Sequence, residues 1–519
     1  MIWHIFKKDV RLLWPLVVGA AALHFAHAAA EYSAWRSDGA SVTANLTELL
    51  FVVSFIGLGS LIVIDVLQDA LPGVRQDWLV RPIRRRDLLA AKLMFMVLLA
   101  QGPLFLADLG QALANGFPLS TSIAAAGSRA IFLLLGFSLP VFIISATLAN
   151  LSEAVICGVA LTVVPMGILM LITALNGGGP PNRNMPVLNS GEQWILDSAR
   201  AIAVVLVGAV ILRLQYFRRK TFASRVFIGV GTLVWVATFF IPWAPAFALE
   251  KKLSAVRGAA DQVAITIDTK AGRVQVPAER VRAAKSRYGD EIFYLPVRVD
   301  HVSVDRTLVY DRTDPYLITS DGKSIALNHG SEISLTRRGP DGSEMSGYEG
   351  FMVPRDIYFR EKDKPVRLEI NHSLTLHELY AAYALPALDG AQRMPGVGAC
   401  RTSLDEDGDE IELRCIQAGD EPSCASVFLE NAKTGEQNPA RGICNPEYAP
   451  YFGKFVYDDM SRFGASLRFN DPTGMMKFPV SGKQLSDARV VVRVLRPVEH
   501  FSRRIVLENI RMSDWEPLP

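Results

Sequence analysis

The first half of the chain contains apolar runs that are long enough to cross a lipid bilayer as helices. A membrane-spanning helix needs roughly 20 predominantly apolar residues. We identify seven candidate spans, at about residues 12–30, 49–68, 88–110, 130–149, 154–175, 199–212 and 226–248. The sixth is short unless it begins near Trp194, and residues 150–153 leave room for a tight turn between the fourth and fifth. These runs predict an α-helical membrane bundle formed by residues 1–248.

The second half of the chain is polar and has the sequence pattern of a water-soluble β structure. Stretches such as "VAITIDT", "EIFYLPVRV" and "RVVVRVL" carry β-branched residues at strand spacing, and turn pairs such as Asp321-Gly322 separate many of them. We expect residues 249–519 to form a mainly-β, sandwich-like domain, with room for two subdomains at about 262–385 and 398–519. One helix is expected at residues 375–383.

Lysine and arginine are unequally distributed between the loops, and this bias predicts the orientation of the spans. If the N-terminus is cytoplasmic, basic residues gather in the inside segments 7–11, 75–92 and 213–225. The outside loops carry four arginines: Arg36, Arg129, Arg183 and Arg200. Seven spans would then place the C-terminal domain outside the cytoplasm. The net charge of +2 gives no sign of a nucleic-acid partner.

Four of the five cysteines lie in the polar half, and this agrees with an exported domain. Cys400, Cys415, Cys424 and Cys444 form an even set, which is typical of two disulfides outside the cytoplasm. A turn at Asp407-Gly408 would place Cys400 opposite Cys415, so we favour the pairs Cys400–Cys415 and Cys424–Cys444, with the other connectivities open. A zinc site is the competing interpretation, although no CxxC pair is present.

The N-terminal segment allows two interpretations. Residues 1–13 place apolar side chains at helical spacing beside Lys7, Lys8 and Arg11, as in an amphipathic helix that lies in the membrane interface. The same segment, followed by an apolar run and Ala26-His27-Ala28, also resembles a cleavable signal peptide, and cleavage would remove the first span.

The search for catalytic motifs predicts no enzyme, no metal site and no cofactor in this chain. "HELYA" at residues 377–381 begins like the HExxH zinc motif, but the second histidine is replaced by Ala381. "SLDEDGDE" resembles a calcium loop, but its glycine and distal carboxylate are out of position, which favours an acidic hairpin tip.

Ionisable residues inside the spans are candidates for a transport pathway, because charge is costly in the bilayer. His24 and His27 lie near the outer end of the first span, and Asp108 lies near the outer end of the third. Asp65 lies near the inner end of the second, where it could pair with the arginines of the following loop. All four could alternatively lie at the membrane interface.

The first inside loop, "DWLVRPIRRRDLLAAK", combines dense positive charge with Trp78 and a rigid Arg81-Pro82 junction. A positive-inside anchor would need the charge alone. Tryptophan and arginine are common in protein-interface hot spots, so docking of a cytoplasmic protein is the sharper hypothesis. The predicted contact residues are Asp77, Trp78, Arg81, Pro82, Arg84, Arg85 and Arg86.

The order of these features resembles the permease subunits of ABC-2-type ABC transporters. In that family the first inside loop commonly follows the pattern W-L-x-R-P-I-x-R-x-x-L-L-x-A-K. The matching residues are Trp78, Leu79, Arg81, Pro82, Ile83, Arg85, Leu88, Leu89, Ala91 and Lys92. The resemblance covers about residues 1–225. It implies an exporter in a bacterial inner (plasma) membrane, a separate ATPase subunit that binds ATP and Mg²⁺ and contacts this loop, and a second permease subunit.

The chain also departs from that family pattern. Such permeases usually end after six spans, whereas this chain has a seventh run and about 270 further residues. The resemblance assigns no role to that added domain. The alternative function is a membrane-anchored extracytoplasmic ligand-binding or sensory protein without transport activity.

Overall fold

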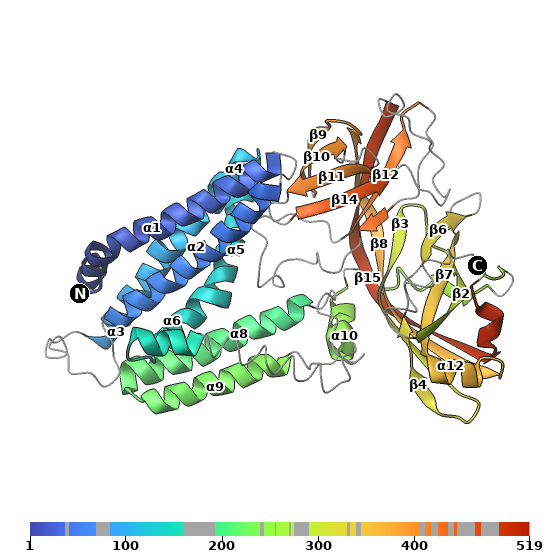
Figure 1. Cartoon of the computed structure of the whole chain (residues 1–519), viewed down its shortest axis with the longest axis horizontal. Helices are drawn as coiled ribbons and strands as arrows, with labels where there is room; N and C mark the ends of the chain where they lie inside the picture. The colour runs from blue at the N-terminus through green and yellow to red at the C-terminus, as the bar shows by residue number, and fades with distance from the viewer. Residues whose placement is uncertain are drawn as a thin grey trace.

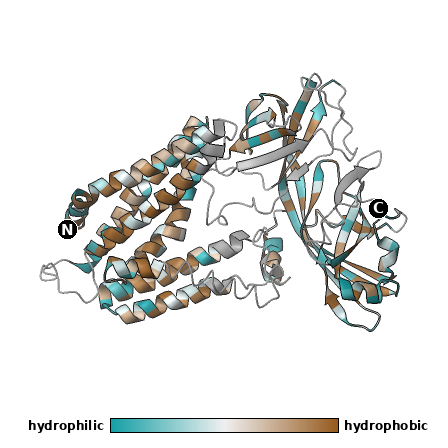
Figure 2. Ribbon diagram, viewed as in Figure 1, coloured by the Kyte–Doolittle hydropathy of each residue, from teal (hydrophilic) through white to brown (hydrophobic). Residues whose placement is uncertain are grey.

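The computed structural model has a helical bundle formed by the N-terminal half and a mainly-β region formed by the C-terminal half (Figure 1). It describes residues 1–36, 41–68, 84–158, 193–238, 243–254, 256–268, 271–274, 290–329, 333–338, 344–395, 397–404, 410–416, 424–433, 441–443, 462–468 and 487–517. Figure 2 shows the difference in composition, with hydrophobic residues along most of the bundle helices and both hydrophilic and hydrophobic residues along the strands of the β region.

The apolar runs form helices because a helix satisfies its backbone hydrogen bonds internally. The helical elements are α1 (Ile2–Arg36), α2 (Ser41–Gln68), α3 (Arg85–Phe95), the π-helical η2 (Met96–Ala100), α4 (Gln101–Ala114), α5 (Leu119–Leu133), the π-helical η3 (Leu134–Ser138), α6 (Leu139–Ser145), α8 (Gln193–Leu212), the π-helical η4 (Arg213–Arg218), α9 (Thr221–Thr238) and α10 (Trp243–Leu253). Within the described residues, five helices are long and apolar enough to cross a membrane: Ile2–Ser33, Leu46–Gln68, Arg85–Ala114, Leu119–Ser145 and Ser198–Arg218.

Three of the predicted spans need correction. The fourth begins at Leu119 rather than at residue 130, because its first turns contain small and polar residues and Arg129, which the count of apolar residues excluded. The described parts of the seventh run belong to two helices, α9 and α10, and residues 239–242 between them lie outside the described residues. At the N-terminus, the expected interface helix and the first span form one helix, α1. Most of the fifth run, residues 159–175, lies outside the described residues.

Among the described residues, one end of the bundle contacts the β region and the other end does not. The turn between α4 and α5 contacts the β region, where Phe117 and Ala112 pack with Ile416 of β11 (Glu410–Ile416). We call this the β-proximal end. The N-terminus, the end of α2, the start of α3 and the start of α9 lie at the opposite, β-distal end (Figure 1). The basic segments at residues 7–11, 84–92 and 213–225 therefore gather at the end away from the β region.

The described residues of the β region form three antiparallel sheets. One contains β1 (Ala264–Ile267), β2 (Asp290–Asp300), β7 (Glu344–Pro354), β5 (Asn328–His329) and β6 (Ile333–Arg338). The second contains β14 (Arg462–Arg468), β11, β10 (Gly398–Leu404) and β9 (Ala391–Met394). The third contains β13 (Arg441–Ile443), β12 (Cys424–Asn431), β15 (Ala488–Ile510), β8 (Val366–Pro386), β3 (Arg306–Ile318) and β4 (Ser324–Ala326). The described β region also contains two short helical segments, α12 (Arg355–Glu361) and η7 (Met512–Trp515).

The long strands β8 and β15 form the central pair of the third sheet. They pair antiparallel from Val366↔Ile510 to Pro386↔Arg489, so the third sheet joins residues from both predicted subdomains. The helix expected at residues 375–383 is wrong, because this segment is part of β8. Its Glu, Leu and Ala favour a helix locally, but Leu374 and Leu376 are fully buried and strand pairing with β3 and β15 overrides that preference.

The predicted disulfide between Cys400 and Cys415 is confirmed. The two residues are direct partners in the register of β10 and β11, and their sulfurs are bonded. The second predicted pair falls partly outside the described residues, because Cys424 begins β12 but Cys444 is not described.

A buried polar cluster attaches α10 to the β region. The Thr375 hydroxyl donates to Asp311 Oδ2 at 2.6 Å and lies 2.7 Å from His500 Nδ1, while His500 Nε2 lies 3.9 Å from Glu250 of α10. Burial raises the pKa of Asp311 to about 7 and lowers the pKa of His500 to about 4. Asp311 is therefore largely protonated below neutral pH, whereas His500 is neutral.

We expect Asp311→Asn to stabilise the protein at alkaline pH. Because the pKa of Asp311 is raised in the folded state, its contribution to stability is complete below about pH 4 and is lost as the pH rises through about 7. The advantage of the variant should therefore grow by about 1.4 kcal/mol per pH unit at most over that window, and then level off. Thermal unfolding of both proteins from pH 4 to pH 8 measures the difference.

The control is Asp314→Asn, on the same strand, whose carboxylate instead accepts a hydrogen bond from Arg312 at 2.7 Å. This variant should gain no stability at pH 8. An Asp311→Asn protein whose advantage does not change with pH would show that Asp311 is ionised throughout this range.

Candidate functional site

One long apolar helix carries a row of buried polar side chains. The continuous helix α3–η2–α4 contains Lys92, Gln101, Asp108 and Gln111, which are between 1% and 8% exposed. We call these four residues the polar stripe. Polar groups inside an apolar bundle are costly unless they are paired, so their partners on neighbouring helices decide what the stripe can do.

At the β-distal end, Lys92 forms an ionic cluster with two other helices. Its ammonium lies 2.9 Å from Asp9 Oδ2 of α1 and 3.1 Å from Asp65 Oδ1 of α2. It also donates to the backbone carbonyl of Asp65 at 2.7 Å. All three residues are at most 1% exposed, and the more exposed Lys8 lies 3.2 Å from Asp9 Oδ1. One lysine therefore joins the β-distal segments of α1, α2 and α3.

In the middle of the bundle, the polar stripe meets a second interrupted helix. The Gln101 side-chain amide donates to the Ser138 hydroxyl, and both residues are buried. Gln101 directly follows the π-helical segment η2, and Ser138 ends the π-helical segment η3. Such segments are weak points in a helix and occur often at functional sites. Both helices therefore carry a π-helical segment at the point where they touch through polar groups.

At the β-proximal end, the polar stripe forms a second paired group. Arg129 of α5 lies 2.9 Å from Asp108, and Gln111 donates to Glu31 of α1 at 2.9 Å. His24 is also buried in this part of α1, and its Nε2 has no hydrogen-bond partner among the described residues. This group joins α1, α4 and α5 with both acidic and basic side chains.

The four predicted intramembrane residues are all buried, but they do not form one site. His24, His27 and Asp108 lie toward the β-proximal end, where His27 contacts the Phe51 ring with centroids 5.6 Å apart. Asp65 lies at the other end and pairs with Lys92. Its alternative pairing with the arginines at residues 75 and 81 falls outside the described residues. A role for these residues in a pathway stays a prediction.

Sequence reasoning missed the partners of these residues. Asp9 belongs to the predicted interface segment, and Lys92 lies where the basic segment 75–92 overlaps the third predicted span, so the sequence does not predict that the two residues pair. Glu31 and Arg129 fell outside the limits of the predicted spans. The signal that could have found Lys92 is its helical spacing from buried Leu88, Ala91 and Phe95, which places it on the same face.

The predicted docking loop is described in part. Arg84, Arg85 and Arg86 are exposed at the start of α3, and Arg85 Nη1 donates to the Phe217 carbonyl of η4 at 2.7 Å. Asp77, Trp78, Arg81 and Pro82 lie outside the described residues. The described arginines lie at the β-distal end, on the same helix as Lys92 (Figure 1).

Comparisons of the chain with protein-family models, with curated proteins and with solved structures found no match. Among the residues that the structure describes, no group of three or more His, Cys, Asp or Glu side chains is arranged to hold a metal ion.

We expect Lys92→Met to destabilise the bundle strongly. The substitution leaves two buried carboxylates facing each other, and removal of one partner of a buried ion pair costs about 3–5 kcal/mol. The thermal unfolding midpoint in detergent should fall by several degrees. The triple variant Asp9→Asn, Asp65→Asn, Lys92→Met removes every formal charge of the cluster and should recover much of the loss.

The matched control is Lys220→Met, an exposed lysine at the same end of the bundle. It should unfold like the native protein. If Lys92→Met also unfolds like the native protein, the ionic cluster does not hold the three helices together.

Proposed function

We propose that this chain is the membrane-spanning subunit of an ATP-driven exporter of the ABC-2 type, coupled to a separate ATPase through residues 69–86. The observation that carries the proposal is the ionic cluster of Lys92, Asp9 and Asp65, which connects the helices on both sides of this loop. The loop lies between α2 and α3, and Lys92 joins the β-distal segments of both helices to α1. A partner that pushes on the loop would therefore move three helices together rather than one.

The distribution of charge supports an orientation in which the β-distal end of the bundle faces the cytoplasm. The basic segments gather at the β-distal end, and basic residues favour the cytoplasmic side of a membrane. The β region would then lie outside the cytoplasm, as a disulfide such as Cys400–Cys415 favours. In a bacterium this corresponds to a multi-pass protein of the inner membrane with a periplasmic domain.

The proposed mechanism assigns different roles to the two ends of the polar stripe. ATP and Mg²⁺ bind to the partner ATPase, and a second permease subunit completes the transporter. Movement of α3–η2–α4 would be transmitted along the helix to the Gln101–Ser138 contact and the Asp108–Arg129 ion pair. Exchange of these contacts would open a route for substrate between α4, α5 and a neighbouring subunit.

The experiment that tests this proposal measures co-purification with the ATPase encoded beside this chain. Arg84→Glu with Arg86→Glu reverses two exposed charges at the start of α3 and should reduce ATPase recovery at least tenfold, because interfacial charge reversal is strongly unfavourable. Membrane insertion and the thermal unfolding midpoint should stay unchanged.

The matched control reverses Arg218 and Arg219, two exposed arginines at the same end, in a different segment. It should retain the ATPase. Equal losses in the two variants would show that the arginines act as general anchors to anionic lipid. A native chain that recovers no ATPase would instead favour the alternative, a membrane-anchored ligand-binding or sensory protein.

A further inference from the structure

One side of the short helix α10 packs on the β region. The Phe247 ring is 5% exposed and lies 6.2 Å from the centre of the His500 ring, and Glu250 Oε1 lies 3.9 Å from His500 Nε2. Leu249 and Leu253, by contrast, are 44% and 59% exposed. In an α-helix, Leu249 lies about 200° around the axis from Phe247, and Leu253 lies one turn beyond Leu249 on the same side. The helix therefore presents an apolar face directed away from its contact with β15.

Basic side chains lie beside this apolar face. Lys252 is exposed, and it is a neighbour of Leu249 on the helix surface because three residues separate them. The Arg257 Nη2 donates to the Lys252 carbonyl at 3.0 Å, which holds a second exposed cation next to the end of the helix. Within the described part of the chain, no carboxylate pairs with either side chain. Both positive charges are therefore available to an anionic group outside the chain.

The position of α10 follows from the length of the helix before it. α9 begins at the β-distal end and has 18 residues, so it is about 27 Å long, close to the roughly 30 Å hydrocarbon core of a bilayer. Residues 239–242 connect Thr238 to Trp243, and a chain of that length reaches about 18 Å at most. Figure 1 shows α10 beyond the ends of α8 and α9, turned across their direction. α10 therefore begins close to where α9 would leave a bilayer.

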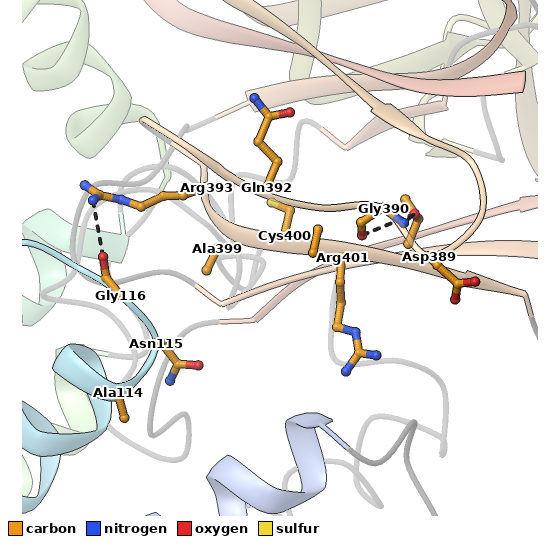
Figure 3. A pocket seen from close by; sticks show the side chains of 12 residues that line it. Ala114, Asn115, Gly116, Asp389, Gly390, Gln392, Arg393, Ala399, Cys400 and Arg401 are labelled. Carbon is orange, nitrogen blue, oxygen red and sulfur yellow. Dashed lines mark hydrogen bonds between the residues drawn. The ribbon is translucent and has the colours of Figure 1, made fainter.

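A second contact of the β region lies at the same end of the bundle. Figure 3 shows Arg393 of the β9–β10 hairpin reaching the turn after α4, where its Nη1 donates to the Gly116 carbonyl at 3.3 Å. This turn connects Arg85–Ala114 and Leu119–Ser145, two helices that are long and apolar enough to cross a membrane. If the bundle spans a membrane as proposed above, the turn marks the surface of that membrane, and the β region lies against the same surface as α10.

We propose that α10 lies in the membrane interface and anchors the β region to anionic phospholipids. Leu249 and Leu253 contact the upper parts of the acyl chains, and Lys252 and Arg257 lie at the phosphate groups. Helices of this kind place an apolar face at the boundary between head groups and acyl chains, and their basic residues attract anionic lipid. The inference rests on the proposal that the bundle spans a membrane, and it does not require the ATPase.

The small size of the apolar face favours lipid over a protein partner. A stable protein interface takes about 20–30 residues from each side, whereas α10 presents two exposed leucines. A helix that is already connected to a spanning helix needs little further attraction to stay on the bilayer, because the connection keeps its effective concentration at the surface high. Two leucines and two cations are therefore sufficient for a lipid contact and too few for a protein contact.

The test attaches an environment-sensitive fluorescent maleimide to single cysteines of the full chain in nanodiscs that contain phosphatidylglycerol. Cys157, Cys424 and Cys444 are replaced by serine, and the disulfide of β10 does not react with the probe. At Leu253→Cys, lipid that carries a doxyl quencher near the glycerol should quench several-fold more strongly than iodide in water, because the apolar face of an interface helix lies about 5–10 Å into the boundary between head groups and acyl chains.

Two matched positions calibrate the quenching. Phe359→Cys is 55% exposed before substitution and belongs to α12, on the side of the β region away from the bundle (Figure 1). It should be quenched by iodide and not by lipid. Leu233→Cys replaces a leucine of α9 that is 69% exposed, and lipid with a doxyl group deep in the acyl chain should quench it.

Charge reversal tests the contact with the phosphate groups. Lys252→Glu should reduce lipid quenching at position 253 several-fold in phosphatidylglycerol nanodiscs, and should have little effect in nanodiscs of phosphatidylcholine alone. Lys251→Glu is the matched control. Lys251 is exposed but lies about 200° around the axis from Leu253, on the side of the helix nearer to the β region. This variant should keep the quenching of the native sequence.

Three results would overturn the inference. Quenching of position 253 by iodide and not by lipid would place the apolar face in water, and protection from both quenchers would show that protein covers it. Equal losses in Lys251→Glu and Lys252→Glu would remove the phosphate contact. A quenched position 233 beside an unquenched position 253 leaves the transporter proposal standing, whereas an unquenched position 233 contradicts the spanning bundle itself.

Discussion

The contact of Lys92 with Asp9 and Asp65 is the interaction on which the arrangement of the bundle depends. Removal of charged groups from water costs several kcal/mol for each ion, and attraction offsets that cost only when the geometry is good. Here one ammonium meets two carboxylates and a backbone carbonyl within 3.1 Å. Because the partners belong to α1, α2 and α3, a shift of any of these helices along its axis would leave a charge buried without its partner.

The β region depends on a different constraint, the pairing of β8 with β15. β8 and β15 lie side by side in the third sheet, and β15 contains residues that contact α10 and the chain after it. The β15 backbone at Val498 accepts a hydrogen bond from Val256, and His500 connects to Glu250 of α10. At the other contact, Arg393 and Ile416 meet the turn after α4. The bundle and the β region are therefore joined both through the chain that follows α10 and through the contacts of Arg393 and Ile416 with the turn after α4.

Sequence reasoning predicted those features that depend on local pattern. The apolar helices follow from uninterrupted hydrophobic runs, and the Cys400–Cys415 pair follows from an acidic turn midway between two strands. The features it missed depend on partners far away in the sequence. The charge of Arg129 is accommodated in an apolar helix because Asp108 pairs with it. Residues 375–383 form a strand because β3 and β15 lie on both sides of them. The burial of Lys92, at the start of the third span, depends on two carboxylate partners that lie 27 and 83 residues away.

The most direct test of the account measures which end of the bundle faces the cytoplasm. Single cysteines at exposed positions, Lys220→Cys at the β-distal end and Arg355→Cys in the β region, would be introduced into a chain whose Cys157, Cys424 and Cys444 are replaced by serine. A membrane-impermeant maleimide applied to intact spheroplasts should label the cysteine at position 355 and should reach position 220 only after lysis. Labelling of position 220 in intact spheroplasts, with position 355 protected, would contradict the proposed orientation and with it the coupling of the arginine loop to a cytoplasmic ATPase.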